Sequence, residues 1–450
     1  MDRFRWDFPV RWFIRVTQFG WIRRGGPAAK DWIMKRIIPI SSGKGGVGKT
    51  SFAINLSLCL ARHGRTVLVD LDTGTSSIRT VIEASIDKDL YHFFKKGEPL
   101  KHCIMPLPKA MDPAGAYGNF GFIAAPRHMI HSIANMDASF RHHLIDALNG
   151  LDADYVVLDL RAGLDPMVTE FLPMSNTGIL VFTPGHPAAT LAAAEIVKAI
   201  LFRKLREVFH VGSPIYRRFQ HPELRPEIIN NMIDRAEDVY QEGMANLDDF
   251  LAAMGERMPD HPLSLMLTDM IESFRVYYVL NRFDGVESSF QTAVAPFLES
   301  VHKNISTRPS VSNLGWIIES RRYHQANADG VPFLLQQHNL RFRRDNRPRK
   351  PKAPTLDQRL EQLYTLSGLR KEKTPRQSKP AARTVSERGR NALENQLHAM
   401  EALFNVKAKE NEVQNFEYIL SCIRYLLKNR RISDFGDTRI LKPGELMHPR

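Results

Sequence analysis

Short apolar runs alternate with amphipathic stretches through the middle of the chain. Residues 37–42 are largely apolar, and Phe52, Leu56, Cys59 and Leu60 then fall on one side of a helix. Further runs of strand length occupy residues 66–74, 155–159, 177–182 and 276–281, and a last one follows residue 314. Buried strands that alternate with helices predict an α/β fold, with a mainly parallel sheet flanked by helices on both faces.

The first 36 residues follow a different pattern, with apolar side chains at even positions from Phe4 to Val16 and arginines at several odd positions. A period of two predicts an extended segment, and Pro9 keeps it out of a central strand. We treat residues 1–36 as a basic, aromatic N-terminal arm. It either contacts an anionic lipid surface or lies as an edge strand across the body.

Beyond residue 340 the chain becomes basic and poor in apolar residues. Residues 341–390 hold sixteen basic and five acidic side chains, which predicts a largely disordered linker with one short helix around residues 356–363. Residues 391–450 carry two apolar stripes, from Leu393 to Phe404 and from Phe416 to Leu427, and these predict a helical hairpin. The hairpin either packs on the body or binds a partner or a second copy.

Composition narrows the class of protein. The formal net charge of +13 is concentrated at the two ends, so residues 37–340 are mildly acidic. The long uncharged window from Phe171 to Ala194 is broken by prolines, and arginines interrupt the N-terminal apolar residues, so neither a membrane span nor a secretory signal is expected. The three cysteines lie far apart in no metal-binding spacing. We therefore expect a cytoplasmic protein.

The strongest chemical signal follows the first apolar run. Residues 43–50 read GKGGVGKT, which matches the phosphate-binding pattern of a P-loop between a strand and a helix. Glycines let backbone N–H groups approach phosphate oxygens, Lys49 neutralises the β and γ oxygens, and Thr50 holds Mg²⁺. The predicted nucleotide contacts in this turn are Gly43, Lys44, Gly45, Gly46, Val47, Gly48, Lys49, Thr50 and Ser51.

The additional lysine at position 44 makes the turn more specific. KGGVGKT resembles the deviant P-loop of the MinD/ParA family of ATPases, which includes relatives of the FlhG type. In that family this lysine reaches the phosphates held by the other subunit of a dimer. The resemblance therefore implies ATP and Mg²⁺ as cofactors, a homodimer formed on ATP binding, and a catalytic role for Lys44 beside Lys49.

The resemblance also suggests roles for residues after later strands. It implies that Asp72 helps to position the attacking water and the metal, and that Asp159 holds the Mg²⁺ shell from the end of its strand. Gly163 matches a switch glycine that meets the γ-phosphate, and Asn281 matches an asparagine near the adenine. The similarity covers roughly residues 37–338 of an ATPase domain that we place at 37–340, interrupted by an expected helical insertion at about 206–272.

Some positions differ from the family pattern. Arg161 stands in the second switch, and Ile317 and Ile318 replace the usual Ile-Pro of the last strand. The closing residues contain no amphipathic lipid-binding helix of the MinD kind. We therefore leave the surface open between an anionic membrane and nonspecific DNA, with which the protein would associate peripherally.

The leading hypothesis is a slowly hydrolysing spatial-regulator ATPase. It would cycle between an ATP-bound dimer on a cellular surface and a released ADP monomer, with an activating protein partner, and so position a cellular structure. The alternatives are a nucleotide-binding scaffold without significant turnover, which docks partners through the insertion and the hairpin, and an iron–sulfur carrier of a related branch. The absence of paired cysteines disfavours the carrier.

Overall fold

The computed structural model describes residues 35–428 and residue 440, apart from 74–76, 174, 211, 214–215, 218–224, 239, 241–242, 260, 345–384 and 408–411. Nearly all of the predicted N-terminal arm, most of the linker and its short helix at 356–363 lie outside the described residues. The boundaries drawn at residues 36, 340 and 390 stay predictions.

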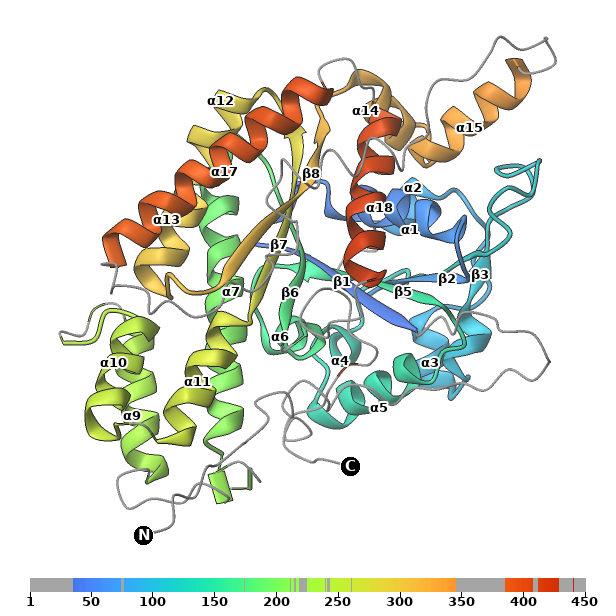
Figure 1. The fold of residues 1–450 in the computed structure, drawn as a ribbon. Coiled ribbons are helices and arrows are strands. Elements are labelled where there is room, and N and C mark those ends of the chain that lie inside the picture. The colour runs from blue at the N-terminus through green and yellow to red at the C-terminus, as the bar shows by residue number, and fades with distance from the viewer. Residues whose placement is uncertain are drawn as a thin grey trace, which may run out of the picture.

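The described strands form one eight-stranded sheet in the order β3-β4-β2-β5-β1-β6-β7-β8 (Figure 1). All neighbouring pairs are parallel except β3 with β4. This confirms the predicted mainly parallel α/β sheet and adds β3 and β4, which the sequence analysis did not predict. The strands are β1 Arg36–Ser42, β2 Thr66–Asp70, β3 Met105–Pro106, β4 Phe120–Ile123, β5 Tyr155–Ala162, β6 Asn176–Phe182, β7 Arg275–Phe283 and β8 Ser310–Ile318.

The strands have apolar sequences that suit their buried positions in the sheet. Every residue of β1, β2 and β6 is buried, as expected for a parallel sheet covered on both faces. β1 lies between β5 and β6, and the strand order runs outward from β1 in opposite directions on its two sides. The turn after β1 therefore opens at the point where the strand order reverses. Ligands of open α/β sheets bind at this kind of switch point, beyond the carboxyl ends of the strands.

Helices cover both faces of the sheet, as predicted. α1, α15 and α18 lie on one face, whereas α7 and α13 pack together on the other (Figure 1). No described helix is both long and apolar enough to cross a membrane. The α-helices are α1 Lys49–Ala61, α2 Ile78–Val81, α3 Leu90–Lys96, α4 His131–Ala134, α5 Ala138–Asn149, α6 Pro166–Phe171, α7 Pro187–Val208, α9 Pro226–Glu237, α10 Leu247–Arg257, α11 Pro262–Glu272, α12 Val286–Ser289, α13 Ala295–Asn304, α14 Arg321–Ala328, α15 Phe333–Arg344, α17 Val385–Lys407 and α18 Glu412–Lys428.

The region expected to be a helical insertion contains α9, α10 and α11, between α7 and β7. α9 packs on α7 and α10, and α10 packs on α11 (Figure 1). The Asp248 carboxylate of α10 accepts hydrogen bonds from the hydroxyl groups of Ser306 and Thr307 at 2.7 and 2.8 Å. These bonds fasten α10 to the segment that leads into β8.

Two C-terminal helices are present, as the apolar stripes predicted, but they lie on opposite faces of the sheet instead of packing on each other as the predicted hairpin. Both pack on the body, on different elements: α17 on α12 and α13, and α18 on β8 and α1 (Figure 1). Helices also extend over both ends of the predicted linker, because α15 continues to Arg344 and α17 begins at Val385. α18 is thereby packed against α1, the helix that follows the turn after β1.

Candidate nucleotide site

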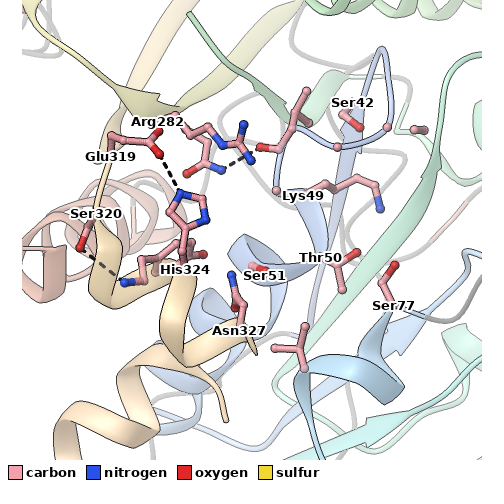
Figure 2. A pocket seen from close by; sticks show the side chains of 18 of the residues that line it. Ser42, Lys49, Thr50, Ser51, Ser77, Arg282, Glu319, Ser320, His324 and Asn327 are labelled. Atoms are coloured by element: carbon pink, nitrogen blue, oxygen red, sulfur yellow. Dashed lines mark hydrogen bonds and ion pairs between the residues drawn. The ribbon is translucent and has the colours of Figure 1, made fainter. Parts of the chain in front are cut away.

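The turn between β1 and α1 borders a cavity of about 290 Å³ at the carboxyl edge of the sheet (Figure 2). That volume lies near the lower end of the range for small-molecule sites. β1, β7 and β8 bring their carboxyl ends to it, and α1 and α14 complete the walls. The residues that line it are Ser42, Gly45, Gly46, Val47, Gly48, Lys49, Thr50, Ser51, Asp72, Ser77, Val81, Ala162, Asn281, Arg282, Ile318, Glu319, Ser320, Tyr323, His324 and Asn327.

Two glycines of the turn are required by its geometry. Gly48 has φ +86°, a left-handed conformation, and an added Cβ would lie 2.2 Å from the Asn281 side-chain nitrogen. Gly43 has an ordinary backbone conformation, but its Cβ would lie 2.4 Å from the Ala192 carbonyl carbon in α7. The turn is therefore fitted closely to β7 at one end and to α7 at the other.

Lys49 and Asp159 form a buried ion pair at the phosphate end of the cavity. The Lys49 Nζ lies 2.5 Å from Asp159 Oδ1, and the two side chains are 6% and 0% exposed. Asp159 stands directly beside β1, because β5 pairs with it in parallel and places Asp159 opposite Ile40. A buried carboxylate is costly unless a cation compensates it, and Lys49 supplies that charge here.

The donor set also fits a divalent cation. Asp159 Oδ2 is buried and has no hydrogen-bond partner among the described residues, so one hard oxygen ligand is available. Thr50 and Asp72 line the adjoining part of the cavity and supply a hydroxyl and a carboxylate. Mg²⁺ prefers such oxygens together with phosphate oxygens, whose charge it neutralises. Thr50, Asp72 and Asp159 are the residues that would hold it.

The two candidate switch residues lie at different distances from the cavity. Asp72 lines it, and its backbone N–H donates to Asp70 Oδ1 at 3.0 Å. Gly163 has φ +88°, and its N–H donates to the Ser42 carbonyl at 2.8 Å, so a phosphate would have to replace that bond. Arg161 pairs with Asp165 at 3.6 Å and donates to the Ala134 carbonyl at 3.3 Å.

Asn281 is placed by the turn itself. Its side-chain nitrogen donates to the Val47 carbonyl at 2.8 Å, and the residue is 3% exposed. This bond ties the end of β7 to the centre of the phosphate-binding turn. Asn281 lies on the cavity wall, and its expected contact with the adenine stays a prediction.

The far wall of the cavity contains residues that sequence reasoning did not identify. Arg282 has φ +55°, which turns the chain at the end of β7, and the Glu319 carboxylate lies 2.7 Å from His324 Nε2 (Figure 2). Tyr323 is buried, and burial raises its pKa more than nearby Asn55 and Ser51 lower it. The positive φ at Arg282 has no sequence signature of the kind that a glycine gives.

The structure gathers most of the predicted nucleotide contacts around one cavity. Gly45 to Ser51, Asp72 and Asn281 line it. Four other predicted residues are not among its lining. Gly43 lies against Ala192 of α7, and Gly163 donates to the Ser42 carbonyl. Asp159 pairs with Lys49, and Lys44 is exposed.

A mostly parallel sheet whose central strand leads through GKGGVGKT into a helix defines the class: this is a P-loop nucleotide-binding fold. A family model described as an AAA domain matches residues 35–205. The septum site-determining protein MinD of Helicobacter pylori is 27% identical over 201 residues, 44% of this chain and 70% of that protein. The chromosome-partitioning ATPase Soj of Thermus thermophilus is 31% identical over 179 residues, 38% of this chain and 66% of Soj.

Among solved structures, MinD of Pyrococcus horikoshii complexed with Mg-ADP covers 67% of this chain and 88% of its own, at 16% identity and a TM-score of 0.39. The sequence matches and the deviant turn with Lys44 together support a P-loop ATPase of the MinD/ParA type. The two sequence matches cover 70% and 66% of the relatives' own length and less than half of this chain.

Proposed function

We propose that this protein is an ATP-dependent dimerising ATPase that cycles between an ATP-bound dimer on a cellular surface and an ADP-bound monomer. The observation that carries the proposal is the unequal placement of two lysines in one turn. Lys49 is buried against Asp159, whereas Lys44 is exposed on the rim of the same turn. A buried lysine serves the nucleotide of its own chain, and an exposed one is accessible to a second nucleotide facing it.

ATP would bias this switch because its γ-phosphate supplies charge that ADP lacks. Binding favours one of two states only through contacts that differ between them. Exposed Lys44 would be such a contact, since a facing γ-phosphate compensates its charge in the dimer. Among the residues at the phosphate end, only Lys44, Lys49 and Asp72 are assigned catalytic roles, so we expect turnover well below about 10 per second until an activating protein partner binds.

The dimer switch can be tested by sedimentation velocity of the full chain with Mg-ATP or Mg-ADP. We expect dimers with ATP only, and monomers for Lys44→Ala with either nucleotide. Lys303→Ala is a matched control, because Lys303 is exposed on α13 at a distance from the turn. Nucleotide binding by Lys44→Ala should persist, which separates the loss of the dimer from the loss of the site. An ATP-dependent dimer in Lys44→Ala would refute the proposal.

The surface can be identified by co-sedimentation with anionic liposomes and, in parallel, with nonspecific duplex DNA. Each mixture should contain ATP or ADP with Mg²⁺. Binding to DNA would fall steeply as salt rises, because counterions compete for the phosphates. ATP-dependent binding to one surface, lost in Lys44→Ala, would support the switch and name that surface. Binding that ignores the nucleotide would favour a nucleotide-bound scaffold.

The scaffold and the carrier make different predictions for other measurements. A scaffold would retain its partners after Lys49→Ala, whereas the ATPase cycle would lose them. An iron–sulfur carrier would purify with iron and colour. Cys59, Cys103 and Cys422 are each buried, and burial raises the pKa of Cys59 to about 12 and of Cys103 to about 11. Burial thus favours the protonated form of these two thiols, whereas metal ligation uses thiolates.

A further inference from the structure

The C-terminal helix α18 contacts two walls of the nucleotide cavity through one aromatic side chain. Phe416 is fully buried, with its ring centroid 6.1 Å from that of Phe52 in α1 and 6.0 Å from that of Tyr323 in α14. α1 begins at Lys49 of the phosphate-binding turn, and Tyr323 lines the cavity. Phe416 is therefore packed between the helix that holds the phosphates and the helix that forms the far wall.

Polar contacts join the start of α18 to the same wall. The Ser320 hydroxyl donates to Glu412 Oε1, and the Ile318 N–H lies 3.4 Å from Asn415 Oδ1. Ser320 is also the N-cap of α14, because its Oγ accepts from the Tyr323 N–H at 3.4 Å. Ile318 and Ser320 both line the cavity. Glu412 thus holds the residue that begins the wall helix.

α18 also lies close to β8, the strand that leads into this wall. An added Cβ at Gly315 of β8 would lie 3.0 Å from Ile419 and 3.1 Å from Tyr418, so the glycine allows α18 to approach. Glu412 and Asn415 are 6% and 2% exposed. The other C-terminal helix, α17, packs instead on α12 and α13, on the opposite face of the sheet.

We propose that α18 positions the far wall of the nucleotide cavity, with Glu412 and Phe416 as positioning residues that act through Ser320 and Tyr323. The inference rests on the proposed function only in requiring that the cavity binds nucleotide. By linkage, a nucleotide that needs the ordered wall stabilises the docking of α18, and docked α18 raises nucleotide affinity by the same factor. A partner that captured α18 would therefore lower nucleotide affinity.

The first test measures the dissociation constant of Mg-ADP for the full chain and four variants. We expect Glu412→Ala and Phe416→Ala to weaken binding roughly threefold to tenfold, the equivalent of one lost hydrogen bond or aromatic contact. Glu412→Gln should restore binding, because its amide oxygen still accepts from Ser320. Glu417→Ala is the matched control: it removes a glutamate of α18 that faces Arg62, 3.7 Å away, instead of the cavity wall.

The second test measures a response that a purely structural helix would not give. Amide hydrogen exchange in α18 should slow when Mg-ADP binds, whereas exchange in α17 should be unchanged. Unaltered affinity in Glu412→Ala, together with unaltered exchange in α18, would overturn the inference while leaving the proposed function intact. A wild-type chain that binds no nucleotide would overturn both. The glutamate variants decide the question even if Phe416→Ala does not fold.

Discussion

The Lys49–Asp159 pair offers the sharpest prediction, because removing one partner leaves a charge buried without compensation. Lys49→Ala would leave the Asp159 carboxylate with 0% exposure and with an Oδ2 that has no partner among the described residues. Removing one member of a buried pair costs about 3–5 kcal/mol. At roughly 2 °C per kcal/mol for a chain of this size, the melting temperature should fall by about 6–10 °C.

The assay is scanning calorimetry of the nucleotide-free protein, with an exposed pair as the control. Lys88 and Glu98 lie 2.8 Å apart and are 39% and 30% exposed, so Lys88→Ala should cost only ~0.2–1 kcal/mol. The double variant Lys49→Met with Asp159→Leu should recover most of the lost stability, because it replaces the pair with apolar side chains of similar size. Mg-ADP should raise the melting temperature of the wild type but not of Lys49→Ala.

One result would refute this reasoning. If Lys49→Ala lost no more stability than Lys88→Ala, the carboxylate of Asp159 would not depend on Lys49 for its charge compensation. The pair would then have to be regarded as a contact of the nucleotide-free state that contributes nothing to folding.

Three further predictions concern the turn, a buried histidine and a buried thiol. Gly48→Ala should abolish Mg-ADP binding in a titration, because of its positive φ and the 2.2 Å approach to Asn281. Gly255→Ala in α10 is the control and should bind normally, because an added Cβ there meets nothing within 4 Å. Burial lowers the pKa of His302, so the unfolded chain takes up a proton first and stability should fall as the pH drops below about 6.5. In calorimetry between pH 7.5 and 5.5, His302→Gln should flatten that fall. An unchanged profile would contradict the assignment. Burial raises the pKa of Cys59 to about 12, so its thiol should react with iodoacetamide at pH 8 only after unfolding, as peptide mass spectrometry would detect.

Local sequence signals predicted the parts of the fold that are encoded locally. The strand, turn and helix from residue 36 to 61 follow from one apolar run, the four glycines of the turn and one apolar stripe. β4 contributes only four residues, Phe120–Ile123, and β3 only two, so neither gives a periodic signal. Short strands of this kind are recognised only when their neighbours in the sheet are known.

The candidate site likewise has one part that the sequence predicts and one part that it does not. The phosphate end could be predicted because glycines and lysines with fixed spacing make it, whereas the far wall is built by tertiary contacts between distant segments. His324 and Asn327 lie on a short polar helix with little apolar periodicity, and Arg282 adopts its conformation at the end of a strand. The apolar stripe of α18 predicted a helix with one buried face but did not specify that this face covers α1 and β8.

The close approach of Gly43 to Ala192 has a mechanical consequence. α7 runs from Pro187 to Val208, and a helix of 22 residues is about 33 Å long. Its first turns touch the phosphate-binding turn, and near its other end Arg206 pairs with Asp234 of α9 at 2.9 Å. α7 is thus a rigid rod between the nucleotide and the α9–α11 layer. A displacement of the turn that moved Ala192 would therefore move the surface of the α9–α11 layer as well, without any change in the sheet.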